Sequence, residues 1–122
     1  MPTKLSPDDL RDIADLLTAE ADALREELSA AETKLTALSE DYDVDAADVS
    51  AKATALASLR ADAERARTLL DRILATLPRI GSPDFGRCVV CGNLIGRDRL
   101  LAVPHTDVCI ACARAGGGSA QV

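Results

Sequence analysis

Four cysteines lie in the last third of the chain, and the sequence contains no others. They form two pairs with the same short spacing, Cys88-x-x-Cys91 and Cys109-x-x-Cys112. A pair with this spacing folds into a tight turn that presents two thiolates to one metal ion, and zinc prefers four such donors in a tetrahedron. The sequence therefore predicts one structural Zn²⁺ ion bound by all four cysteines.

Other chemistry fits these residues less well. Four thiolates fill the zinc tetrahedron and leave no open position for a substrate, so we expect no zinc catalysis and no ligand role for His105. A disulfide or redox protein is the remotest alternative. The N-terminus lacks a signal-peptide core, which favours a cytoplasmic location, and paired CxxC motifs in a reducing cytosol more often bind metal than form disulfides.

Length and composition limit the fold that positions these cysteines. The chain has 122 residues, enough for one compact domain or two small ones. Its aromatic residues are Tyr42 and Phe85, with no tryptophan, and Leu and Ala dominate, which favours close-packed helices. A net charge of −6 makes the chain a poor non-specific nucleic-acid binder. No apolar run approaches the length of a membrane span.

Residues 6–77 have the pattern of two long helices. Ser6 and Pro7 are typical of a helix N-cap and first position, and Asp8 and Asp9 follow at the positive end of the helix dipole. Seam residues then recur with alternating steps of four and three, as in a coiled coil. In the first segment they are Leu10, Ala14, Leu17, Ala21, Leu24, Leu28, Ala31, Leu35 and Leu38. In the second they are Val49, Lys52, Leu56, Leu59, Ala63, Ala66, Leu70, Ile73 and Leu77.

These two seams predict an antiparallel hairpin in one register. Nine consecutive pairs, from Leu38 with Val49 to Leu10 with Leu77, have residue numbers that sum to 87. This register places the turn at 41–45 and gives a finger roughly 42 Å long at about 1.5 Å per residue. It also favours an intramolecular hairpin and a monomer. Ile13 and Leu16 lie outside the seam, and we expect them to pack against the zinc module or a partner.

The predicted fold class is all-α dominated: a long antiparallel coiled-coil hairpin with a small C-terminal four-cysteine zinc-finger module. Prolines and glycines predict a linker at 78–84. The zinc finger then occupies 85–115, and the glycine-rich residues 116–122 are expected to be a disordered tail.

Carboxylates crowd the expected tip of the hairpin, near 41–48. Asp45 suits the N-cap of the second helix, and Asp48 stands three residues later, as in a capping box. Capping and solubility explain such a cluster without any further function. The functional alternative is that the finger carries carboxylates to a metal ion or to basic groups inside a partner, since carboxylates are natural neighbours of Mg²⁺.

The segment around the cysteines resembles the DksA/TraR family of bacterial RNA polymerase regulators. The matching residues run from Phe85-Gly86 through Cys88 and Cys91-Gly92 to Ile95, then Arg99-Leu100, Ala102, Pro104 and the second cysteine pair. They are similar to the family's FGxCxxCGxxIxxxRLxAxP…CxxC signature. With the hairpin, the resemblance covers roughly residues 6–114.

The resemblance implies a function for the hairpin. Family members insert it into the secondary channel of RNA polymerase and regulate initiation without reading a promoter sequence, so RNA polymerase is the expected partner, with no sequence-specific DNA binding. The family's tip motif, Asp-x-x-Asp-x-Ala, implies functional roles for Asp45 and Asp48. Ser50 replaces the alanine and adds a hydroxyl that must be solvated or bonded.

The resemblance also bears on nucleotide binding. Relatives that bind guanosine tetraphosphate use basic side chains near the zinc finger and at the base of the second helix. This chain keeps Arg72 but has Val103 and Ala113 at two such places, which weakens the case for this alarmone. The remaining candidates for contact with a nucleotide or with polymerase are Arg97, Arg99 and Arg114. Offset of the thiolate charge and ordinary solubility explain the same arginines without any contact.

Two other functions fit the same architecture. One is a Gre-like factor that stimulates transcript cleavage, with tip carboxylates positioning a second Mg²⁺; the four-cysteine signature favours the regulator instead. The other is a coiled-coil adaptor whose zinc finger binds another protein or nucleic acid and which is indifferent to charge at the tip.

Overall fold

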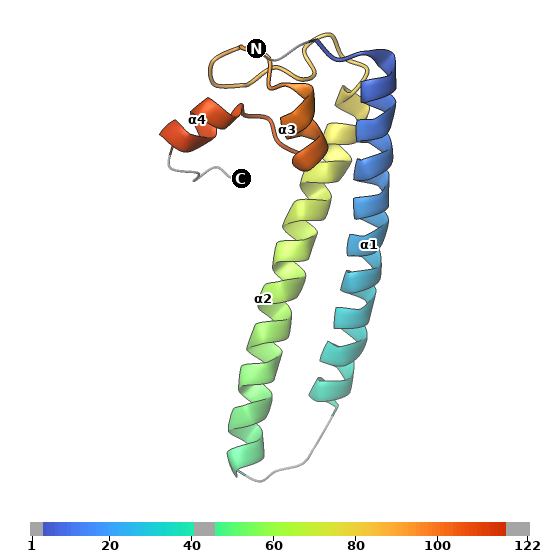
Figure 1. Cartoon of the computed structure of the whole chain (residues 1–122). Helices are drawn as coiled ribbons and strands as arrows, with labels where there is room; N and C mark the ends of the chain where they lie inside the picture. The colour runs from blue at the N-terminus through green and yellow to red at the C-terminus, as the bar shows by residue number, and fades with distance from the viewer. Residues whose placement is uncertain (1–3, 41–45, 117–122) are drawn as a thin grey trace. The chain divides into compact units, whose positions relative to one another are not determined.

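The computed structural model describes residues 4–40 and 46–116, with side chains except at 46–48. The elements in chain order are α1 (Pro7–Ser39), α2 (Ala46–Thr76), the 3₁₀ turn η1 (Leu77–Arg79), α3 (Arg97–Ala102) and α4 (Ile110–Ala115) (Figure 1). The described residues contain no strand, only one isolated bridge between Arg87 and Leu94. This helical architecture confirms the predicted fold class. No helix in the described part of the chain has an apolar stretch that would cross a bilayer.

A reciprocal cap begins α1, as its sequence predicts. The Ser6 hydroxyl accepts a hydrogen bond from the Asp9 backbone N–H at 3.1 Å, and the Asp9 carboxylate accepts one from the Ser6 N–H at 3.0 Å. These two bonds satisfy backbone donors that a helix N-terminus otherwise leaves unpaired.

The chain divides into two compact units, and each long helix has residues in both. One comprises residues 1–20 and 73–122 and holds the cysteines; we call it the finger unit. The other comprises residues 21–72 and holds most of the two long helices; we call it the hairpin unit.

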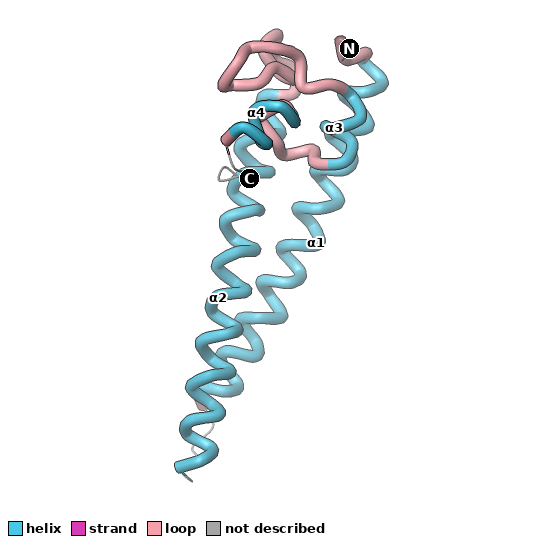
Figure 2. The backbone as a smooth tube through the Cα atoms, turned by 60° about the vertical axis from the view of Figure 1, so that its left-hand side comes forward, coloured by secondary structure: helices cyan, strands magenta, loops and turns pink. Residues whose placement is uncertain are grey.

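In the hairpin unit α1 and α2 lie side by side and run in opposite directions (Figures 1 and 2). Its buried side chains all belong to the predicted seam: Ala21, Leu24, Leu28, Ala31, Ala66 and Leu70. The faces that the two helices present to each other are therefore those that the heptad pattern predicts.

The predicted register of the hairpin is wrong. Arg67 Nη2 lies 3.8 Å from Glu32 Oε1, and these two residue numbers sum to 99. In the predicted register, with sums of 87, Arg67 would face residue 20. Glu32 would then lie twelve residues further along α1, about 18 Å away along the helix axis. A shift of one heptad changes the sums to 94 and places Arg67 opposite residue 27. Glu32 is then five residues away, about 7.5 Å along the axis, a distance that the two side chains can span.

Exposure at the start of α2 agrees with the shifted register. Val49 is 52% exposed, whereas the 87 register would place it opposite Leu38. In the shifted register Leu38 faces Leu56. Figure 1 shows that α2 extends beyond the end of α1. A heptad seam repeats every seven residues, so a shift by seven again places seam residue opposite seam residue. The apolar pattern alone therefore does not distinguish the two registers.

Three helices meet in the core of the finger unit. Ile13 and Leu17 of α1, Ile73 of α2 and Leu100 of α3 are fully buried. Ile13 lies outside the seam, and its burial agrees with the expectation that it packs beside the zinc module. Leu16 is 42% exposed, so for this residue the expected partner contact stays a prediction.

The backbone of Gly86 lies close to side chains of this core. Gly86 has φ of +89°, and a Cβ atom there would lie 3.0 Å from Leu5 Cδ1 and 3.9 Å from Leu100 Cδ1. Both the backbone conformation and the space therefore require glycine at the start of the finger.

Candidate metal centre

The first cysteine pair lies in a tight turn closed by backbone hydrogen bonds. The Cys88 N–H donates to Asn93 O at 2.8 Å, and the Gly92 N–H donates to Cys88 O at 2.9 Å. The Val90 N–H points to Cys88 Sγ at 3.4 Å, as expected for a donor that stabilises a thiolate. We call residues 88–91 the first knuckle.

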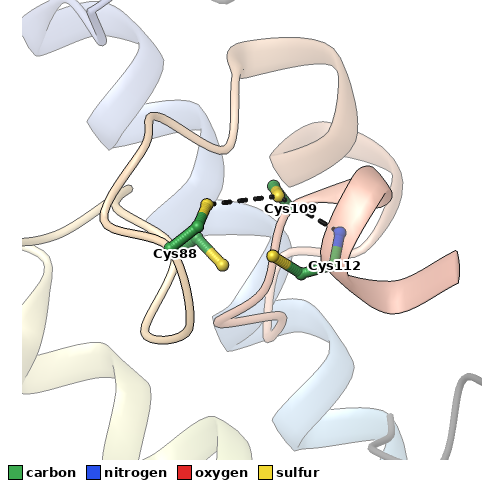
Figure 3. A group of neighbouring side chains, drawn as sticks. Cys88, Cys109 and Cys112 are labelled. Carbon is green, nitrogen blue, oxygen red and sulfur yellow. Dashed lines mark hydrogen bonds between the residues drawn. The ribbon is translucent and has the colours of Figure 1, made fainter. Parts of the chain in front are cut away.

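The second cysteine pair begins α4. Cys109 is the N-cap residue, and its sulfur accepts the Cys112 N–H at 3.4 Å (Figure 3). The Ala113 N–H donates to Cys109 O at 2.9 Å and continues the turn into the helix. We call residues 109–112 the second knuckle.

Backbone and side-chain bonds hold the two knuckles together. The Val89 N–H donates to Asp107 O at 2.9 Å, which ties the first knuckle to the segment before the second. Arg99 Nε donates to Val108 O at 2.9 Å, and the Thr106 hydroxyl donates to the same carbonyl at 3.2 Å. Arg99 therefore braces the segment that delivers Cys109.

The four sulfurs fit a tetrahedral zinc site. All four ligand atoms lie within 4.8 Å of one another, and Cys91 Sγ and Cys109 Sγ are 3.7 Å apart. With Zn–S bonds of about 2.3 Å, the edges of a tetrahedral four-thiolate site measure about 3.8 Å. A disulfide would need about 2.05 Å, and all four cysteines are free. The arrangement supports the predicted structural zinc ion, held by Cys88, Cys91, Cys109 and Cys112.

The thiol pKa values show why the cluster needs a cation. Burial raises the pKa of the Cys88 thiol, but backbone N–H groups of Cys109, Cys91 and Val90 oppose this effect, and the pKa falls to about 6. Hydrogen bonds to the sulfurs of Cys109, Cys88 and Cys91 raise the pKa of Cys112 to about 12. Four sulfurs this close do not all ionise unless a positive charge compensates them, and Zn²⁺ supplies that charge.

Two of the candidate contact arginines are used inside the finger unit. Arg97 Nε donates to Asp9 Oδ1 at 2.7 Å, and its Nη1 lies 3.7 Å from Asp98 Oδ1. A hydrogen bond from the Ser6 backbone, followed by one from Arg97, lowers the pKa of the Asp9 carboxyl. Arg99 forms the brace described above. These contacts give both arginines structural roles that their sequence positions did not reveal.

The other predicted residues are placed less fully. Arg114 is exposed in the last turn of α4, and Arg72 is exposed on α2 in the hairpin unit. Ser50 is exposed near the start of α2, and its carbonyl accepts a hydrogen bond from the Thr54 hydroxyl at 3.1 Å. Asp45 lies outside the described residues, as does the side chain of Asp48. The roles of these residues stay predictions.

Sequence reasoning missed the second role of Asp9. It assigned this residue to the helix N-terminus, yet the same carboxylate caps Ser6 and binds Arg97, which is 88 residues away in the chain. Local sequence carries no signal for a contact of this separation.

Comparison with known proteins identifies the finger. Residues 83–115 match the model of the prokaryotic dksA/traR C4-type zinc finger. Over nearly the whole chain, the fold is similar to the structure of transcription factor DksA2 from Pseudomonas aeruginosa. The match covers 93% of this chain and 87% of that one, with a TM-score of 0.81 and 25% sequence identity. Residues 83–115 are therefore a dksA/traR-type zinc finger, and the fold of the chain is similar to that of DksA2.

Curated relatives match this chain over a shorter segment. It is 47% identical over 49 residues to the RNA polymerase-binding transcription factor DksA of Haemophilus influenzae, and 45% identical over 49 residues to that of Escherichia coli. Each match covers 40% of this chain and about a third of the relative, 34% and 32% respectively.

Proposed function

We propose that this chain binds RNA polymerase and inserts the end of its helical hairpin into the secondary channel, where it modulates transcription initiation. The observation that carries the proposal is the combination of a dksA/traR zinc finger with a fold similar to DksA2 over 93% of the chain. The curated relatives that share the finger are RNA polymerase-binding transcription factors.

The two units suit different parts of this task. The hairpin unit is a pair of long helices with a narrow Leu/Ala seam, a shape suited to entering a channel. The tip carries Asp45 and Asp48, whose carboxylates would act near the Mg²⁺-dependent active centre of the polymerase. The finger unit holds one end of each long helix in a fixed geometry through its core and its zinc site.

We propose that the protein acts without catalysis of its own and in the cytoplasm, where the polymerase works. A zinc ion with four thiolate ligands has no open coordination position for a substrate or an activated water. Its contribution would be structural.

Paired substitution of the tip tests the proposal. Asp45→Asn with Asp48→Asn removes two charges at nearly constant volume, so the fold and polymerase binding should persist while regulation of initiation is lost. The assay is single-round transcription from a responsive promoter, run beside a binding titration with purified polymerase. Regulation that survives in the double variant would refute a role for the tip carboxylates.

The same assay separates the Gre-like alternative. A cleavage factor would shorten the RNA in stalled elongation complexes, whereas the proposed regulator should leave transcript length unchanged.

A further inference from the structure

Exposed apolar side chains gather on the two zinc knuckles. Among the described residues, six large hydrophobic side chains are exposed, and three of them lie between paired cysteines. Val89 is 62% exposed and Val90 70% exposed in the first knuckle, and Ile110 is 50% exposed in the second. Ala111, the remaining residue between paired cysteines, is also exposed.

These side chains belong to two knuckles that lie close together. The bond from Val89 N–H to Asp107 O holds the first knuckle against the segment that leads into the second, and the four sulfurs lie within 4.8 Å of one another. We call Val89, Val90 and Ile110 the knuckle patch. Single exposed hydrophobic side chains are normal, but several of them gathered on one small module are typical of an interaction site.

The zinc site does not require apolar side chains at these positions. The knuckle bonds of Val89 and Val90 use backbone N–H groups, which every residue type except proline provides. None of the three side chains belongs to the buried core of the unit. Their apolar character is therefore free to serve contact with another molecule.

Positive charge flanks the patch. Arg87 Nη1 donates to Gly92 O at 3.1 Å, which places its guanidinium at the first knuckle. Arg114, the one charged residue of α4, stands four residues after Ile110 and thus lies on the same side of the helix. Asp107 is the nearby carboxylate, and both arginines are exposed. An apolar centre with two arginines at its edge complements an apolar segment flanked by carboxylates.

We propose that the knuckle patch docks an apolar, acid-flanked segment of RNA polymerase, as a second contact separate from the hairpin tip. This inference rests on the proposed function. A second copy of the chain is a poorer occupant, because a two-fold contact would bring the arginines of one copy towards those of the other. Nucleic acid is also poorer, since phosphates gain little from an apolar centre.

Substitutions in the first knuckle test the two parts of the proposal, the apolar contact and the acidic flank of the partner segment. Val90→Asp and Val90→Lys each remove apolar surface, but only the aspartate repels an acidic segment. We measure the affinity of zinc-loaded protein for core RNA polymerase by competition with a labelled wild-type chain. Val89→Ser with Val90→Ser should weaken binding about tenfold, as for a central interface contact. Val90→Asp should weaken binding several-fold more than Val90→Lys, and this difference should shrink as salt is raised.

Matched controls make the result specific. Leu74→Ser removes an exposed aliphatic side chain from α2 in the same unit and should leave affinity unchanged. Zinc content and melting temperature are measured for every variant. We expect both to match the wild type, because the substituted side chains are exposed. The same preparations are examined by sedimentation for self-association.

The outcomes separate this inference from the proposed function. Wild-type affinity in the double serine variant would overturn the patch while leaving the proposed function intact. Equal losses for Val90→Asp and Val90→Lys would overturn the acidic occupant, and a dimer that dissociates in the serine variant would assign the patch to a second copy. A wild-type chain that does not bind polymerase would overturn both proposals.

Discussion

Different kinds of internal contact stabilise the finger unit and the hairpin unit. The contacts of the finger unit do not repeat along the chain. They are a core of four fully buried side chains from three helices, a four-thiolate site and the Asp9–Arg97 pair. In the hairpin unit, leucines and alanines repeat along a seam, and none of them ranks among the largest fully buried side chains. Non-repeating contacts specify one arrangement, whereas a repeating seam specifies faces and leaves register to other features.

This difference predicts that removing zinc damages one unit selectively. Cys91→Ser should abolish zinc binding and melt the finger unit, because structural zinc contributes about 10–16 kcal/mol of binding free energy in finger peptides. The helices of the hairpin unit should persist, so most of the far-UV circular dichroism should remain. Val90→Ser in the same knuckle is the control and should keep one zinc per chain. A Cys91→Ser protein that retains stoichiometric zinc would contradict the assigned ligand set.

Truncation of buried leucines should sharpen the contrast. Leu100→Ala creates a cavity in the finger core and should cost about 2–5 kcal/mol of unfolding free energy. Leu56→Ala, at a half-buried seam position, should cost about 1 kcal/mol. Urea denaturation of the zinc-loaded proteins measures both values. Equal losses would mean that the seam is packed as tightly as the finger core.

The Asp9–Arg97 pair should make a smaller contribution with a defined pH dependence. Asp9→Asn should lower the melting temperature, because the carboxylate both caps α1 and binds Arg97. The pKa of Asp9 is lowered in the folded protein, so its contribution is present above the ordinary aspartate value and lost only as pH falls through the lowered pKa.

The deficit of Asp9→Asn should therefore be the same at pH 8 and at about pH 5, above the ordinary aspartate pKa of about 3.9. Asp8→Asn, on an exposed neighbour in the same helical turn, controls for the loss of one charge. A deficit that vanishes by pH 5 would contradict the lowered pKa.

The smallest effect tests the hairpin register. Glu32 and Arg67 are about two-thirds exposed, so a double-mutant cycle with Glu32→Gln and Arg67→Gln should give a coupling of about 0.2–1 kcal/mol. A cycle between Glu32 and Arg60 is the control and should give none. Coupling to Arg60 in place of Arg67 would restore a register closer to the sequence-based one.

The sequence predicted those features that depend on local or periodic patterns. The zinc ligands follow from the spacing of Cys88, Cys91, Cys109 and Cys112, and the helix faces follow from heptads. The register failed because the seam is unchanged by a shift of seven residues, and the Glu32–Arg67 contact that distinguishes the alternatives lies outside the seam. The structural roles of Arg97 and Arg99 were missed because their partners lie far away or on the backbone.

We propose that the chain acts inside RNA polymerase, and competition for the secondary channel is the decisive measurement. Purified zinc-loaded protein is titrated onto core RNA polymerase with and without a Gre-type factor that occupies the secondary channel. We expect saturable binding that the factor displaces. Saturable binding that is indifferent to the factor would place the contact elsewhere on the enzyme. No binding at micromolar concentration would reduce the likeness to DksA2 to a likeness of fold.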